Sequence, residues 1–235
     1  MVLAQHMADV RIAVLTLTRD RLEYTQHCFD SLRENAGCAF DHYVLDQGSE
    51  DGTREWLTSE RLVGRIRHVV YAGENIGCCR GWNRLLDGCH PADYDAVVTF
   101  DNDCEVLTYD ALAVVAELAV DHQFILSPQV HGLMYPPATI ANLQLGRYTV
   151  DEKAIIGNIF MAIPATLFSL ERFRWDETYA VWDGGESITQ WYRQRGGRCG
   201  YVQGFGVNHY KTTLGQVEDM PWYFERRVLE GGRAQ

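Results

Sequence analysis

The chain has 235 residues, 46% hydrophobic and 23% charged, so it is long enough to bury a full core as one domain or one domain with an appended lobe. Its formal net charge of −11 argues against a large nucleic-acid-binding surface, which would need a basic footprint. A small polyphosphate ligand bridged by a metal ion remains compatible, because the cation supplies positive charge locally.

The seven cysteines are an odd number and form no paired CxxC knuckles, which predicts reduced, mostly buried thiols. Residues 1–9 lack the pattern of a signal peptide. The most apolar window, 154–170, contains Asn158 and Pro164 and falls short of a membrane span. We therefore expect a soluble, cytoplasmic protein without a transmembrane segment.

The first half of the chain alternates short apolar runs with segments of helical periodicity. The predicted strands cover 10–17, 43–45, 66–71 and 96–100, and the predicted helices cover 22–35, 53–63, 78–89 and 109–121. Strands that alternate with helices imply right-handed crossovers and a largely parallel sheet. Ligands bind beyond the carboxyl ends of the strands in such sheets, where Asp46 and the segment 101–103 would lie together.

The pattern changes near residue 127. A strand over 124–126 is followed by a proline-punctuated stretch, which we expect to be irregular until about 151. Further predicted elements are a strand over 154–163, a short helix opened by Pro164, a helix over 187–195, a strand over 201–207 and an amphipathic helix over 217–229. We expect one domain over 1–235, built of lobes 9–126 and 127–235.

The apolar run 97–100 ends in Asp101-Asn102-Asp103. Two like charges this close repel, so both stay ionised only if a cation lies between or beside them. Mg²⁺ or Mn²⁺ suits such a site, because these ions bind one or two carboxylates and complete their shell with water and phosphate oxygens. The alternative is a polar turn in which Asp101 or Asp103 caps the next helix.

Four motifs follow one another in the first half of the chain. They are Thr18 with Arg21, the turn Asp46-Gln47-Gly48-Ser49-Glu50-Asp51-Gly52-Thr53, Asn75-Ile76-Gly77 with Asn83, and Asp101-Asn102-Asp103. In this order they resemble the nucleotide-sugar glycosyltransferases of GT-A fold, particularly the family 2 type, closely over residues 10–105 and more loosely over 150–210. The resemblance implies an α/β, Rossmann-like, mostly parallel sheet with helices on both faces. It also implies that 9–126 binds the nucleotide and that the smaller lobe 127–235 binds the acceptor.

The resemblance implies a nucleotide-diphosphate sugar donor, with UDP favoured, and an acceptor hydroxyl that the sequence does not identify. The implied donor-binding residues are Thr18, Arg21, Asp46, Asn75, Gly77, Arg80, Asn83, Asp101 and Asn102. Asp46 would accept an N–H of the base, a role that suits a carboxylate because it only accepts hydrogen bonds when ionised. The alternative for Asp46 is a turn-forming aspartate.

The resemblance also implies a metal centre. Asp103 would bind Mn²⁺ or Mg²⁺ directly, Asp101 would bind the metal, its water or the ribose, and His209 would be a further ligand. The alternative for His209 is a structural histidine at a strand end.

Inverting members take their catalytic base from an acidic pair that opens a helix in the second lobe, usually from its second acid. Here the segment is Gly184-Gly185-Glu186-Ser187, so a serine stands at that position. Glu186 is the favoured base and Asp183 the second candidate, provided that one lies within reach of the acceptor hydroxyl. Glu186 could instead stabilise the start of the helix. Trp182 and Tyr179 are candidate acceptor contacts, although core packing explains them equally well.

A metal-dependent glycosyltransferase, inverting by analogy, is therefore the leading interpretation. The serine at 187 keeps open a retaining mechanism, or a protein that binds the nucleotide sugar without transferring it. A nucleotidyltransferase of similar architecture is a further alternative, but it would carry a glycine-rich basic loop after the first strand, and 17–21 contains no glycine.

Overall fold

The computed structural model describes residues 10–133, 136–178 and 184–210, and for residues 184–186 it describes the backbone alone. The predicted helix over 217–229 lies outside the described residues.

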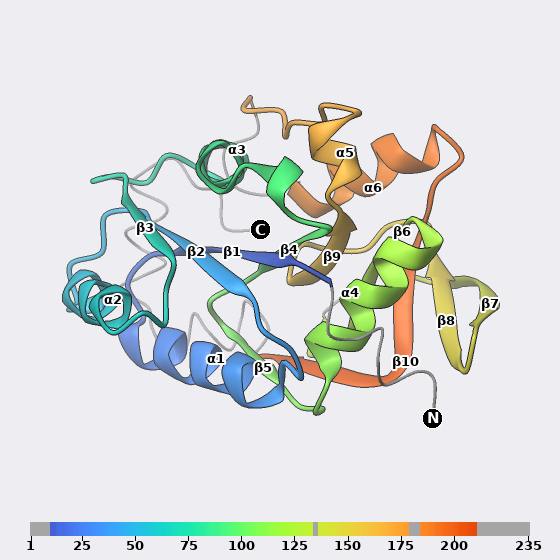
Figure 1. Ribbon diagram of the computed structural model, residues 1–235, viewed down its shortest axis with the longest axis horizontal. Helices are drawn as coiled ribbons and strands as arrows, with labels where there is room; N and C mark the ends of the chain where they lie inside the picture. Colours follow the sequence, from blue (N-terminus) through green and yellow to red (C-terminus); the bar gives the residue numbers. More distant parts are fainter. Residues whose placement is uncertain (1–9, 134–135, 179–183, 211–235) are drawn as a thin grey trace.

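The described strands form one mixed sheet in the order β3-β2-β1-β4-β9-β6-β10-β8-β7, with β5 paired to β10 (Figure 1). They span Ile12–Thr18 (β1), Asp41–Asp46 (β2), His68–Tyr71 (β3), Ala96–Phe100 (β4), Cys104–Val106 (β5), Phe124–His131 (β6), Thr139–Leu145 (β7), Tyr148–Lys153 (β8), Phe160–Pro164 (β9) and Arg198–His209 (β10). The strands β3, β2, β1 and β4 are mutually parallel, whereas β9 runs antiparallel to β4. The predicted α/β class with a largely parallel central sheet is confirmed.

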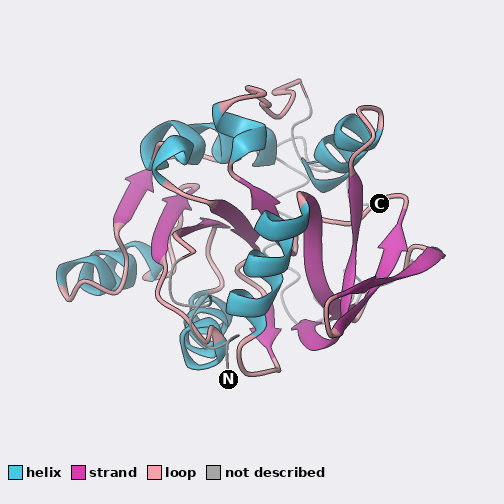
Figure 2. Ribbon diagram, turned by 45° about the vertical axis from the view of Figure 1, so that its right-hand side comes forward, coloured by secondary structure: helices cyan, strands magenta, loops and turns pink. Residues whose placement is uncertain are grey.

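Helices cover both faces of this sheet (Figures 1 and 2). One face carries α1 (Leu22–Asn35), α2 (Thr53–Leu62) and α4 (Ala111–His122), and the other carries α3 (Cys78–Cys89), α5 (Thr166–Ser169) and α6 (Gly184–Arg193). A 3-10 turn, η2 (Pro91–Asp93), precedes β4. Successive side chains of a strand point to opposite faces, so Val14 belongs to the core cluster that contains Phe29 of α1, while Leu15 belongs to the one that contains Trp82 of α3. A strand that is covered on both faces is largely apolar, and this explains why 96–100 is hydrophobic except for Thr99.

The strands differ from their prediction in several places, most of them in the second half of the chain. The stretch 127–151, expected to be irregular, contains the end of β6 and the hairpin β7–β8, which lies at the right edge of Figure 1. The pattern failed there because β7 is an edge strand in which only Leu145 is buried. The predicted strand over 154–163 begins only at Phe160, and the three-residue β5 is too short for its periodicity to be recognised. Since β6 crosses residue 127 without leaving the sheet, the division into two lobes stays a prediction.

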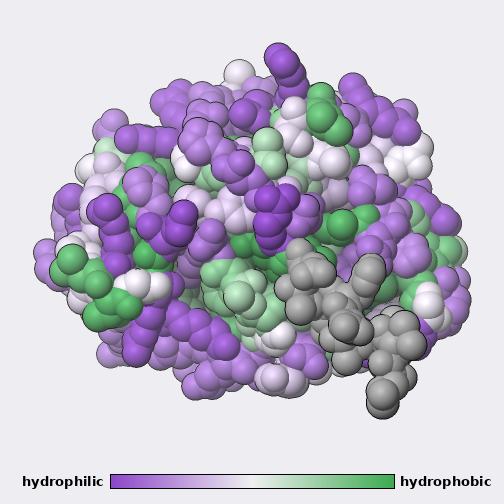
Figure 3. Space-filling model, viewed as in Figure 1, coloured by the Kyte–Doolittle hydropathy of each residue, from purple (hydrophilic) through white to green (hydrophobic). Residues whose placement is uncertain are grey.

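All seven cysteines are free thiols and five are buried, as predicted. Among the described helices, none combines the length and the apolar character that crossing a bilayer requires. The face seen in Figure 3 is largely hydrophilic at its periphery and carries an apolar patch over the end of α2, where Leu62 and Val63 are exposed.

A buried carboxylate joins the hairpin to the rest of the sheet. Glu152 of β8 lies opposite Gly200 of β10, and its side chain is 7% exposed. Arg198 donates two hydrogen bonds to it, at 3.1 and 2.8 Å, and Arg193 of α6 donates a third at 3.2 Å. The hydrogen bonds from Arg198, followed by those from Arg193, lower the pKa of Glu152 below its ordinary value.

Glu152→Gln should destabilise the protein at neutral pH by about 1–2 kcal/mol, the scale of lost charge-assisted hydrogen bonds to partly exposed arginines. Because the folded-state pKa is depressed, the carboxylate contributes stability above its unfolded pKa and loses it as the pH falls through the folded one. The Tm difference between parent and variant should therefore have its largest value at pH 7 and decrease below about pH 4. The exposed Glu171→Gln is the matched control, and a Tm difference that is independent of pH would contradict this role.

Asn83 ties α3 to the segment that follows α5. Its Nδ2 donates to the carbonyl of Trp175 at 2.8 Å and to Glu177 Oε1 at 3.0 Å, and its Oδ1 accepts from the Trp175 N–H at 3.0 Å. Trp175 is buried against Trp82 and Phe168, so this contact holds two parts of one apolar cluster together.

Asn83→Ala should cost about 2–3 kcal/mol, because it leaves the buried N–H of Trp175 without its acceptor. Chemical denaturation with tryptophan fluorescence would measure this loss. Asn75→Ala, at an exposed turn, should change the free energy of unfolding by less than about 1 kcal/mol. Equal losses of unfolding free energy in the two variants would argue against a stabilising contact between Asn83 and Trp175.

Candidate functional site

The acidic pair lies at the carboxyl end of β4, next to the start of β9. The N–H of Asp101 donates to the carbonyl of Ile159 at 2.9 Å, which extends the β4–β9 pairing by one residue. One ligand atom each from Asp101, Asp103 and His209 lies within 4.8 Å of the others. Two carboxylates and an imidazole at this spacing fit Mn²⁺ or Mg²⁺ in a site completed by water and phosphate.

Pairing of β5 with the end of β10 brings His209 to the aspartates. Cys104 lies opposite His209 in this antiparallel pair, and Tyr210 donates its N–H to the carbonyl of Asp103 at 2.9 Å. His209 Nε2 thereby lies 3.5 Å from Asp103 Oδ1. The predicted histidine is thus part of the cluster.

The electrostatics of the cluster favour a bound cation. Burial, reinforced by the negative charge of Asp103, raises the pKa of Asp101 to about 7, while Arg21 opposes this rise. Without further positive charge, the two carboxylates therefore do not both ionise readily near neutral pH. A divalent ion between them would allow both carboxylates to ionise, because it stabilises the ionised form of each ligand.

The helix-cap alternative for these aspartates is wrong. The helix that follows, α4, begins at Ala111, and Asp110 occupies its N-cap position. Asp101 and Asp103 are therefore too early in the chain to cap it.

Arg21 links the acidic motif to the first strand and helix. Its guanidinium donates to Asp103 Oδ2 and to Asn102 Oδ1, both at 2.9 Å. Asn102 in turn donates to the hydroxyls of Thr18 and Thr25, at 3.1 and 2.9 Å. The structure thus brings together four predicted residues (Thr18, Arg21, Asn102 and Asp103) and adds Thr25.

Asp46 shapes the neighbouring turn. Its carboxylate is fully buried and accepts the N–H groups of Gly48 at 3.2 Å and Ser49 at 3.3 Å, with Arg54 Nε at 3.7 Å. Asp46 therefore forms a turn with its own side chain, as the alternative for this residue predicted. Gln47 donates its N–H to the carbonyl of Thr18 at 2.9 Å, so this turn is connected to β1 and to the metal-site network.

The third motif forms the next turn along the same edge. Asn75 Oδ1 accepts the N–H of Gly77 at 3.0 Å, and Gly77 has a φ of 86°, which favours glycine. Gln47 Oε1 accepts the N–H of Ile76 at 3.1 Å, which joins this turn to that of Asp46. Arg80 and Asn83 instead contact a carboxylate of the chain itself. Arg80 Nε lies 3.4 Å from Glu177 Oε2, and Asn83 Nδ2 donates to Glu177 Oε1 at 3.0 Å. For these two residues a donor contact stays a prediction.

The predicted catalytic segment is described in part. Helix α6 begins at Gly184, three residues earlier than predicted, so Glu186 belongs to its first turn. A carboxylate there is favourable beside the helix N-terminus, but this leaves its catalytic role a prediction. Asp183, Trp182 and Tyr179 lie outside the described residues.

Besides Thr25, two residues of the network were not predicted from the sequence. The ring centroid of Tyr210, the residue after His209, lies 5.5 Å from those of Tyr24 and His27 in the first half of α1. Asp20 accepts the N–H of Glu50 at 2.8 Å and donates its own N–H to Ser49 Oγ at 2.7 Å. Only the position of Tyr210 beside His209, and of Asp20 beside Arg21, could have suggested them.

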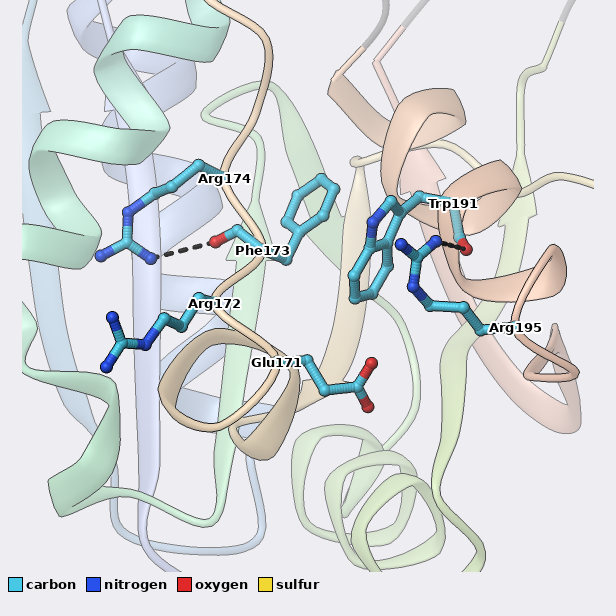
Figure 4. Close-up of a pocket in the computed structure, with 6 residues that line it drawn as sticks. All are labelled: Glu171, Arg172, Phe173, Arg174, Trp191 and Arg195. Carbon is cyan, nitrogen blue, oxygen red and sulfur yellow. Dashed lines mark hydrogen bonds between the residues drawn. The ribbon is translucent and has the colours of Figure 1, made fainter.

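A separate hollow of about 580 Å³ lies between the segment after α5 and the far end of α6 (Figure 4). It is lined by Glu171, Arg172, Phe173, Arg174, Trp191 and Arg195. Phe173 packs on Trp191 at 5.0 Å, and the guanidinium of Arg195 lies 4.2 Å from the indole centroid. None of the predicted site residues lines it, so the acidic cluster remains the candidate site.

The amino-acid sequence matches a known family model, and the fold is similar to that of several solved structures. The family model described as "Glycosyl transferase family 2" matches residues 13–167. No curated protein sequence matches the chain significantly. Solved structures with a similar fold include GalNAc-T7 with UDP, GalNAc and Mn²⁺, which is 14% identical with a TM-score of 0.68 over 87% of this chain and 44% of that one.

Two further similar structures carry nucleotide sugars. S. aureus TarS 1–349 in complex with UDP-GlcNAc is 14% identical, with a TM-score of 0.61 over 86% of this chain and 59% of that one. The mannosyltransferase PcManGT from Pyrobaculum calidifontis, in complex with GDP-Man and Mn²⁺, is 16% identical, with a TM-score of 0.67 over 96% of this chain and 66% of that one.

At these identities the likeness shows a shared fold alone, and this chain spans 44–66% of the length of these three solved chains. The family model covers more than half of the chain, residues 13–167 of 235, and the chain therefore belongs to glycosyl transferase family 2.

Proposed function

We propose that this protein is a metal-dependent glycosyltransferase that moves a sugar from a nucleotide-diphosphate sugar to an acceptor hydroxyl, with inversion at the anomeric carbon. The observation that carries the proposal is the convergence of Asp101, Asp103 and His209 beyond the carboxyl end of β4, in a chain of glycosyl transferase family 2.

Asp101, Asp103 and His209 would hold Mn²⁺ or Mg²⁺, which when bound supplies the positive charge that stabilises a departing diphosphate. The close spacing of the three ligand atoms and the raised pKa of Asp101 support this assignment. So do the similar structures of GalNAc-T7 and PcManGT, both of which contain Mn²⁺.

UDP is the favoured donor nucleotide. The similar structures of GalNAc-T7 and TarS contain UDP or UDP-GlcNAc, while that of PcManGT contains GDP-Man. Asp46 would accept an N–H of the base with a lone pair that Gly48 and Ser49 leave available. Because the Asp46 side chain is fully buried, neighbouring groups would have to move aside when the nucleotide enters.

Glu186 would act as the base of the transfer step. Its carboxylate would take the proton of the acceptor hydroxyl as that oxygen forms a bond to the anomeric carbon. The bond from this carbon to the phosphate oxygen breaks, and the nucleoside diphosphate departs with the electron pair. The position of Glu186 in the first turn of α6 supports this role, whereas Ser187 at the usual place of the base favours the binding-only alternative.

Asp103→Ala should lower the release of UDP from UDP-sugars by roughly 10²-fold or more, the loss expected when a stabiliser of transition-state charge is removed. It should also abolish Mn²⁺-dependent binding of UDP in calorimetry. Asp121→Ala, an exposed aspartate on α4, is the matched control. Activity that survives in the presence of a chelator would rule out the metal-dependent mechanism.

Glu186→Gln should leave UDP binding unchanged and remove transfer, because an amide cannot take the proton of the hydroxyl at neutral pH. Donor binding by calorimetry and product formation by mass spectrometry measure the two effects separately. If this variant transfers sugar at the parent's rate, Glu186 is not the base. If the parent binds the donor but neither hydrolyses nor transfers it, the binding-only alternative holds.

A further inference from the structure

We propose that Arg21 is a positioning residue of the metal centre, which holds Asp103 so that one carboxylate oxygen faces the metal while the other stays bound to the protein. This inference rests on the proposed function. It differs from the donor contact that the family resemblance implies for Arg21, because the guanidinium is directed at a carboxylate and an amide of the chain itself.

The two oxygens of Asp103 have different partners. Oδ2 accepts the hydrogen bond from Arg21 at 2.9 Å, whereas Oδ1 lies 3.5 Å from Nε2 of His209, on the side of the metal cluster. The side chains of Arg21 and Asp103 are each only 9% exposed, so water competes weakly for this contact. A carboxylate that is held by one oxygen presents the other in a fixed direction, which is how outer contacts orient metal ligands.

The second arm of the guanidinium fixes the turn itself. It donates to Asn102 Oδ1, and Asn102 is anchored through Nδ2 to Thr18 at the end of β1 and to Thr25 in α1. The fork of an arginine can make both bonds at once, because its N–H groups are coplanar and rigidly spaced. The turn 102–103 is thereby held from the neighbouring strand and helix as well as by β4.

The backbone of Arg21 indicates that its side chain is needed. It adopts φ 60° and ψ 47°, the left-handed region, at the N-cap of α1, and its side chain makes no cap hydrogen bond. Glycine or asparagine reaches this conformation more easily and would start the helix as well. An arginine at a strained position in a site is best explained by a function of its guanidinium.

Positioning and simple electrostatics predict different outcomes for Arg21→Lys, since electrostatics alone predicts unchanged metal binding when the charge is kept. The positive charge of Arg21 repels a cation, so if charge alone mattered, its removal would tighten metal binding. If Arg21 positions Asp103, replacement by lysine should weaken metal binding although the charge is kept, because one ammonium group cannot bridge Asn102 and Asp103 as a fork does.

The test is a titration of Mn²⁺, without nucleotide, into the full chain and its variants, followed by the loss of the electron paramagnetic resonance signal of free Mn²⁺. Arg21→Lys should weaken binding at least about tenfold, the range seen when outer contacts of metal ligands are lost. Asn102→Ala, which removes the acceptor of the second arm but none of the three ligands, should also weaken it several-fold. Arg61→Gln, an exposed arginine on α2, should bind Mn²⁺ as the parent does.

The Tm and circular dichroism of each variant show whether it is folded, and affinities count only for variants within a few degrees of the parent. If Arg21→Lys binds Mn²⁺ as tightly as the parent or more tightly, the positioning role is excluded while the metal centre stands. If the parent itself binds no Mn²⁺, the metal centre of the proposed function and this inference both fall. If Arg61→Gln weakens binding as much as Arg21→Lys, the loss does not come from the contacts of Arg21 with Asp103 and Asn102, and the positioning role is excluded.

Discussion

The crowding of Asp101 and Asp103 at the end of β4 is the constraint on which the rest of the site depends. Two carboxylates and an imidazole converge where water is partly excluded, and such a group is unstable without compensating charge. In the protein alone, part of the compensation comes from a proton, since the pKa of Asp101 is about 7, and part from Arg21. A divalent cation would provide the remainder, so the same arrangement that costs stability in the free protein favours metal binding.

The sheet makes this crowding possible because β4 lies at the change from parallel to antiparallel pairing. On one side it pairs with β1, whose end carries Thr18. On the other side it pairs with β9, and the carbonyl of Ile159, just before β9, receives the N–H of Asp101. The long strand β10 then crosses back and meets β5, and this pairing delivers His209. Elements from both halves of the chain are thus needed for one site, although the division into two lobes remains a prediction.

Much of the nucleotide side of the fold could be predicted from the sequence, because each strand–helix unit there has a strong and distinct periodicity. The helices predicted over 22–35 and 78–89 agree with α1 and α3 in both bounds. The edge hairpin β7–β8 could not be recognised in the same way, since strands with little buried surface lack a clear pattern. For the site, the order of motifs brought the acids to one edge, but β5 was missing from the prediction, and with it the physical reason why His209 arrives there.

The hydrogen-bond partners of individual side chains were the hardest feature to predict from the sequence. Asn83 fits the family pattern by its spacing, yet its amide binds Trp175 and Glu177, which lie far away in the sequence. Asp46 fits equally well, and its carboxylate closes its own turn. Spacing therefore identifies which residues gather at an edge, whereas the competition between backbone, side chain and ligand for each polar atom is decided only in three dimensions.

The middle residue of the acidic motif illustrates this competition. Asn102 accepts a hydrogen bond from Arg21 and donates two to threonine hydroxyls, so it needs both a carbonyl and an NH₂ group. An aspartate there would add a third negative charge beside Asp101 and Asp103 and would lose both donations. An apolar residue would remove the acceptor that Arg21 has in Asn102 Oδ1. Of the side chains of this size, only an amide satisfies its neighbours without adding charge. The position between the two aspartates is thus constrained by their support, and this constraint acts before any ligand arrives.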